Sequence, residues 1–138
     1  MGSEMCIRDR SPEECGSYGL PYLRAFRAGA PDLDTAEKLA AYCAQFEHAA
    51  GWLFDSYTPS YGGSGQTFDY ALLTEIAALG TRARPIVVSG GLKQETVAAS
   101  IQALNPWAID VSSGVEDAPG VKSAIKMRDF IQTVNTLS

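Results

Sequence analysis

The sequence contains few of the residues that build metal sites and disulfide frameworks. Its 138 residues include one histidine, His48, and three cysteines that form no Cys-x-x-Cys pair. A lone histidine without ligand partners at metal spacing argues against a zinc site. The small, odd number of cysteines fits a reducing compartment better than secretion.

Basic residues and long apolar runs are also scarce. Eleven Lys and Arg stand against 16 Asp and Glu, which gives a formal net charge of -5. The chain therefore lacks the basic stripe that displaces counterions from nucleic acid, and no apolar run is long enough to span a bilayer. We expect neither a nucleic-acid nor a membrane partner. The negative charge does not exclude anionic small molecules as ligands, because backbone amides can hold a phosphate inside an acidic protein.

From Ser11 onward, strand-like and helix-like segments alternate. We expect strands at 22–27, 51–55, 84–89 and 108–112, and helices from 11, at 34–46, 70–79 (closed by Gly80), 94–104 and 121–134. Continuous apolar strands joined by helices predict a parallel sheet with helical cover. Residues 1–10 match nothing downstream, and Met-Gly-Ser resembles a cloning scar, so we interpret residues 1–10 as a non-native leader.

The predicted strands end in FDSY, SGG and DVSSG, where parallel α/β folds collect their chemistry. Asp55 is a candidate acid, because the preceding Trp-Leu-Phe run would desolvate its carboxyl group and favour the protonated form. A capping aspartate is the alternative. The turns 89–91 and 112–114 would let backbone N–H groups approach an anion. Either turn alone is ordinary turn chemistry, but their occurrence on consecutive strands favours a phosphate site.

The glycine-rich loop GGSGQT (62–67) is neither of two familiar nucleotide-binding motifs. It lacks the lysine of a P-loop, and Phe68 stands where a dinucleotide fingerprint has its third glycine. The loop is either a mobile connector or a lid over the strand ends.

Four segments resemble the carboxyl half of phosphoribosylanthranilate isomerase: SPEEC…LPYLRAFRA, LFDS…GGSGQTFDY, RPIVVSGGLKQETV and, most specifically, IDVSSGVEDAPGVKS. The resemblance runs from about Ser11 to the end. It implies an α/β fold, a partial (β/α)8 TIM barrel with about strands 5 to 8 and their helices, in residues 11–138. It also implies an isomerase of tryptophan biosynthesis, which converts N-(5-phosphoribosyl)anthranilate to 1-(2-carboxyphenylamino)-1-deoxyribulose 5-phosphate. The implied partner is a small-molecule sugar phosphate, with no metal and no cofactor.

The resemblance also assigns roles to residues. Asp55 matches the family's acid, and Asp110 matches the aspartate that we expect to orient the substrate. The loop containing Gly63 and Gly65 would close over the substrate. The backbone amides of four further residues would hold the phosphate: Gly90, Gly91, Ser113 and Gly114.

The chain departs from the family pattern where the general base is expected. The family's base is a cysteine in a Lys-Ile-Cys-Gly-like motif after the first strand, and a substrate-binding arginine follows the second. This chain has neither residue. Cys6 lacks the glycine that follows the family's cysteine, and Cys15 and Cys43 fall on predicted helices. We expect His48 to be a cap or surface group, and Arg24 and Arg27 to be salt-bridge or rim groups. The chain alone should therefore be inactive.

A complete barrel of this type needs at least ~200 residues. Half a barrel would leave open strand edges and an apolar inner face, so we expect marginal stability or self-association through those edges. Two alternatives stay open: a non-catalytic phosphate-binding half-barrel, and a relative of indole-glycerol-phosphate synthase, which would use lysine and glutamate at its strand ends. We expect a cytoplasmic protein, or a plastid protein if a transit peptide was lost.

Overall fold

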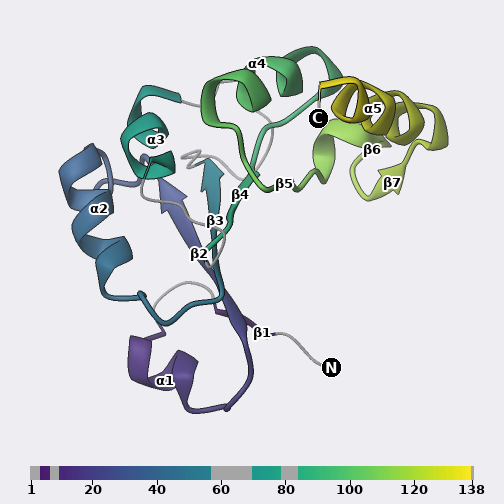
Figure 1. Cartoon of the computed structure of the whole chain (residues 1–138). Coiled ribbons are helices and arrows are strands. Elements are labelled where there is room, and N and C mark those ends of the chain that lie inside the picture. The colour runs from purple at the N-terminus through teal and green to yellow at the C-terminus, as the bar shows by residue number, and fades with distance from the viewer. Residues whose placement is uncertain (1–3, 7–9, 57–69, 79–83, 138) are drawn as a thin grey trace.

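The computed structural model of the chain contains one sheet of five parallel strands, with helices arranged in an arc along one side (Figure 1). It describes residues 4–6, 10–56, 70–78 and 84–137. The strands follow each other across the sheet in sequence order: β1 (Glu4–Cys6), β2 (Tyr22–Ala28), β3 (Gly51–Ser56), β4 (Ile86–Ser89) and β5 (Ala108–Ile109). The predicted α/β fold with a parallel sheet is therefore confirmed.

The strand β1 lies in the segment that we interpret as a non-native leader. Its backbone pairs in parallel with the first three residues of β2, Tyr22–Arg24. The origin of residues 1–10 stays a prediction, because a short strand pairing does not distinguish a native segment from a foreign one.

The helices are α1 (Pro12–Gly16), α2 (Ala36–Ala44), α3 (Tyr70–Ala77), α4 (Gln94–Leu104) and α5 (Ala124–Leu137). From α2 onward, each helix packs against the next. Polar caps begin two of them: the Ser11 hydroxyl accepts from the Glu14 N–H at 3.2 Å, and Thr35 Oγ1 accepts from the Lys38 N–H at 3.3 Å. The bounds of α4 match the prediction, whereas Gly80, predicted to close α3, lies outside the described residues.

An aromatic cluster joins β2, β3 and α2 on the helix-covered side of the sheet. Phe26 stacks on Phe54 with ring centroids 5.4 Å apart, and it meets Phe46 and Trp52 edge-on. These side chains are at most 2% exposed. Burying an aromatic side chain of this size contributes about 1.5–3 kcal/mol, so this cluster holds α2 against the strands whose far ends carry the candidate site.

The carboxyl-terminal helix begins later than predicted. We expected it to start at Val121, but Val121–Lys122 forms strand β7, which pairs antiparallel with β6 (Glu116–Ala118). The reason is a contact that helical periodicity does not show: the Lys122 ammonium binds Glu116 and Ser112, so this stretch runs as a hairpin. The predicted strand 108–112 is likewise shorter, because β5 ends at Ile109.

Cys15 and Cys43 lie on helices, as predicted, whereas Cys6 ends strand β1, and the two helical cysteines differ in oxidation state. Cys43 is a free thiol and fully buried in α2. Cys15, in α1, is disulfide-bonded. The sequence did not predict this bond, and the reducing compartment stays a prediction.

Candidate active site

Four polar side chains form a row across the carboxyl ends of the strands. Arg27 of β2 is in register with Asp55 of β3, and Asp55 is in register with Ser89 of β4. Asp110 follows β5 directly, and its N–H donates to the Val88 carbonyl oxygen at 2.9 Å. The Ser89 hydroxyl donates to Asp110 Oδ2 at 2.8 Å. The structure thus brings together the two aspartates predicted from the strand ends and adds Arg27 and Ser89, which sequence reasoning did not select.

Asp55 is half-buried, and its surroundings favour the protonated carboxyl group. Burial raises the pKa of Asp55 above its ordinary value, as the preceding apolar run predicts. The Arg27 charge lowers this pKa, the Asp110 charge raises it, and a hydrogen bond from the Ser56 N–H lowers it. A carboxyl group that keeps its proton to higher pH is suited to general acid catalysis near neutrality.

The two predicted phosphate turns lie next to this row and against each other. Gly90 and Gly91 have φ of +84° and +63°, which side-chain-bearing residues rarely adopt. A Cβ on Gly90 would run into Asp55 Oδ1 and would lie 2.5 Å from the Ser56 nitrogen. A Cβ on Gly114 would run into the Leu92 carbonyl oxygen and would lie 2.9 Å from its carbon. Only glycine therefore lets the 89–91 turn approach Asp55 and the 112–114 turn approach Leu92.

Lys122 anchors the second turn and was missed as a site residue. Its Nζ donates to the Ser112 carbonyl oxygen at 2.9 Å, to Ser112 Oγ at 3.1 Å and to Glu116 Oε1 at 2.7 Å. The bond from Lys122 is also the largest cause that lowers the pKa of Glu116. Lys122 is the lysine of the segment DVSSGVE…PGVK, so the sequence signal was present, but its role depends on a contact across ten residues.

Other candidate groups lie away from this row. The His48 side chain is 90% exposed beside Glu47, as expected for a surface group. Arg24 is 1% exposed and lies 4.1 Å from the Phe46 ring centroid, so of the two expected roles the rim position is wrong and the salt bridge stays a prediction. Burial raises the pKa of Cys43 to about 12. Gly63 and Gly65 lie outside the described residues.

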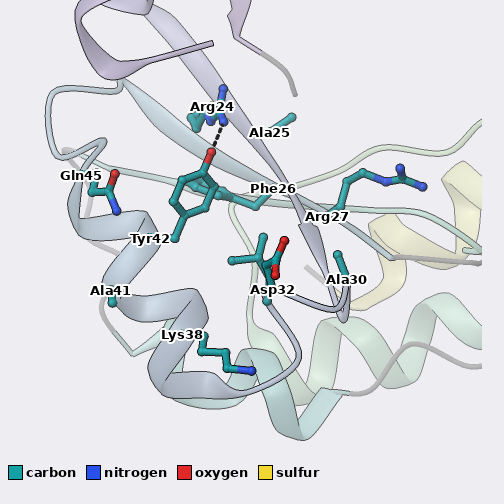
Figure 2. Close-up of a pocket in the computed structure, with 11 residues that line it drawn as sticks. Arg24, Ala25, Phe26, Arg27, Ala30, Asp32, Lys38, Ala41, Tyr42 and Gln45 are labelled. Carbon is teal, nitrogen blue, oxygen red and sulfur yellow. Dashed lines mark hydrogen bonds between the residues drawn. The ribbon is translucent and has the colours of Figure 1, made fainter. Parts of the chain in front are cut away.

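A cavity of about 630 Å³ lies between β2 and α2. Figure 2 shows Arg24 donating to the Tyr42 hydroxyl at one side of it, at 2.7 Å, while the Arg27 side chain extends away from this pair. Asp55, Ser89 and Asp110 do not line this cavity. A second cavity of about 640 Å³ lies at the opposite ends of β4 and β5, near Ile86 and the 73% exposed Trp107. Of the four residues in the row, Arg27 lines the first cavity, whereas Asp55, Ser89 and Asp110 line neither.

Among the described residues, no three His, Cys, Asp or Glu side chains gather in a way that could hold a metal ion. In the same part of the chain, no helix has the length and apolar character needed to cross a membrane.

The fold and its strand-end row define an α/β protein of the βα-repeat class, resembling TIM-barrel proteins in carrying its polar groups at the carboxyl ends of parallel strands. Residues 10–133 match the family model of N-(5'phosphoribosyl)anthranilate (PRA) isomerase. The chain belongs to this family.

Named relatives and solved structures agree with this assignment. The chain is 57% identical over 129 residues to N-(5'-phosphoribosyl)anthranilate isomerase of Bordetella bronchiseptica, covering 94% of this chain and 59% of that protein. It resembles the phosphoribosyl anthranilate isomerase structure from Thermotoga maritima with a TM-score of 0.81 and 29% identity, covering 99% of this chain and 63% of that one. The structure from Thermococcus kodakaraensis matches with a TM-score of 0.76 and 31% identity, over 96% and 62% of the two chains. This chain thus spans about three fifths of the length of the relatives it matches.

Proposed function

We propose that this chain supplies the acid and the phosphate-binding half of a phosphoribosylanthranilate isomerase, with β2 to β5 as strands 5 to 8 of a (β/α)8 barrel. The observation that carries the proposal is the position of Asp55. It is a half-buried carboxyl group with a raised pKa, adjacent to Asp110 and to the glycine turn at 89–91. The substrate is N-(5-phosphoribosyl)anthranilate, and the reaction is its Amadori rearrangement.

In this proposal Asp55 protonates the ribose ring oxygen, and the ring opens to a Schiff base. A base then removes the proton from C2 of the sugar, and the resulting enol amine rearranges to the ketone. Asp110 orients the substrate, and the loop with Gly63 and Gly65 closes over it. The backbone amides of four residues hold the phosphate: Gly90, Gly91, Ser113 and Gly114.

In this proposal the base comes from outside the described residues, since Cys6, at the end of β1, lacks the glycine that follows the family's base. Cys43 is fully buried with a pKa raised to about 12, and Cys15 is disulfide-bonded, so neither provides a thiolate near neutral pH. The chain alone is therefore inactive as an isomerase.

Reconstitution tests this proposal. Co-expression with a fragment that contains strands 1 to 4 of the Bordetella bronchiseptica relative should restore isomerase activity. In the restored enzyme, Asp55→Asn should lower kcat by about 10²- to 10⁴-fold, because general acid catalysis typically contributes that much. Asp34→Asn is the matched control, since Asp34 forms an exposed pair with Lys38 and should leave kcat unchanged. Full activity in the Asp55→Asn complex would remove Asp55 from the acid role.

A second candidate function is non-catalytic phosphate binding. The two glycine turns abut through Gly114 and Leu92 within this chain, so their arrangement does not depend on a base supplied from elsewhere. Titration with ribose 5-phosphate, followed by NMR of the Gly90 and Gly114 amides, separates the two functions. Binding without turnover, even beside the complementary fragment, favours the non-catalytic function. A cytoplasmic location stays a prediction.

A further inference from the structure

Ser89 occupies the centre of the polar row and lies between two carboxylates. It is in register with Asp55 on one side, and its Oγ lies 2.8 Å from Asp110 Oδ2 on the other. Residues paired across neighbouring parallel strands project from the same face of a sheet. Arg27, Asp55 and Ser89 therefore leave the sheet on one face, and the hydrogen bond brings Asp110 to the same place.

The Ser89 hydroxyl distinguishes the two aspartates. A hydroxyl group carries one proton to donate, and here that proton goes to Asp110 rather than to Asp55. Ser89 is only 9% exposed, whereas Asp110 is exposed. This hydrogen bond holds the Asp110 carboxyl group at a fixed place in the row, where its charge acts on Asp55.

We propose that Ser89 is a positioning residue that holds the Asp110 carboxyl group beside Asp55 and so helps Asp55 to keep its proton. This inference rests on the proposed function of Asp55 as the acid. It adds a residue that does not transfer a proton itself: Ser89 sets the difference between the two carboxylates through Asp110.

The charged groups around Asp55 agree with this division of roles. Arg27, on the neighbouring strand β2, favours the ionised form of Asp55, whereas Asp110, beyond β4, opposes it. The Ser56 N–H, the next residue of β3, also favours the ionised form. Among these groups, Asp110 is the one whose position depends on the Ser89 hydroxyl.

The test is an NMR titration of the Asp55 carboxyl carbon in the full chain. Ser89→Ala should shift the Asp55 midpoint downward, because Asp110 loses the hydrogen bond that holds it beside Asp55. Ser89→Thr keeps the hydroxyl group and should retain the wild-type midpoint. In an Asp110→Asn background, Ser89→Ala should have no further effect on Asp55. An unchanged or raised Asp55 midpoint in Ser89→Ala overturns the proposal.

Two further readouts keep the test decisive. If Ser89→Ala does not give a dispersed spectrum, then Ser89→Thr and Asp110→Asn decide. The proposal requires a wild-type Asp55 midpoint in Ser89→Thr and a lowered Asp55 midpoint in Asp110→Asn. The opposite result in either variant overturns it. The titration needs no turnover. A failed reconstitution of isomerase activity would therefore contradict the proposed function while leaving the role of Ser89 to be decided by the midpoints.

Discussion

At the scale of the residue, burial makes Asp55 a weaker acid and links its protonation to the stability of the fold. Because the pKa of Asp55 is higher in the folded chain than in the unfolded chain, the folded state binds the proton more tightly. Its contribution to stability is therefore fully present below the ordinary aspartate pKa, about 3.9, and is lost as the pH rises through the raised value.

This linkage predicts that Asp55→Asn unfolds at higher urea concentration than the wild type near neutral pH. The advantage should shrink as the pH falls toward about 3.9. Asp34→Asn is a control whose change in stability near neutral pH should have the opposite sign, because the hydrogen bond from Lys38 lowers the pKa of Asp34. Urea unfolding curves across this range check both variants. A less stable Asp55→Asn at neutral pH would contradict the expected sign.

The glycine at position 114 is required by close packing. Gly114→Ala would drive its Cβ into the Leu92 carbonyl group, so we expect a loss of about 1–3 kcal/mol in the free energy of unfolding, typical of overpacking. Gly16→Ala is the matched control, since a Cβ at Gly16, in α1, meets nothing within 4 Å. It should be neutral or stabilising by up to ~1 kcal/mol. Equal stability changes in the two variants, measured by urea unfolding, would disprove the packing role.

At the scale of the element, the hairpin of β6 and β7 supports the turn that precedes it. Lys122 binds Ser112 and Glu116 together, and the Gly120 N–H donates to Glu116 Oε2 at 3.1 Å. The turn at 112–114 is thus held from one side by the hairpin and from the other by its contact with Leu92.

Lys122→Met should therefore loosen the second turn without unfolding the chain. We expect several-fold weaker binding of inorganic phosphate and altered NMR shifts of the Ser113 and Gly114 amides. Lys38→Met is the control, because Lys38 forms an exposed pair with Asp34 in and before α2. Unchanged phosphate affinity in Lys122→Met, measured by NMR titration, would show that the hairpin does not support the site.

At the scale of the whole molecule, the sheet is open at both ends. Among the described residues, β1 pairs only with Tyr22–Arg24, so the last four residues of β2 have no strand beside them on that side, and β5 lies at the other end of the sheet. The face away from the helices is less exposed than half a barrel suggests, because Leu53 and Val87 are each only 6% exposed. Unpaired backbone at strand edges remains the feature that favours association.

We therefore predict that the chain self-associates through these edges. Light scattering should give a mass above 14.7 kDa that rises with protein concentration. Adding the complementary fragment should replace this species with a complex of the two chains, because the fragment would occupy the same edges. A monodisperse monomer with a sharp cooperative melt would contradict the prediction.

The sequence by itself determined most of the strands and helices, although not β1 or the hairpin of β6 and β7. A strand-like run bounded by glycine and proline produced β2, an apolar run from Gly51 produced β3, and a helix-like segment produced the bounds of α4. It also placed Asp55 and Asp110 at strand ends and predicted the direction of the Asp55 pKa shift, which burial causes.

Only the tertiary structure decided which of these groups meet. Arg27, Asp55 and Ser89 become neighbours through strand register, which joins residues about thirty positions apart, and Ser89 selects Asp110 through one hydrogen bond. The contacts of Gly114 with Leu92 and of Lys122 with Ser112 are likewise absent from any local pattern. Local periodicity reports which face of an element is buried, whereas lateral pairing and packing determine what that face contacts.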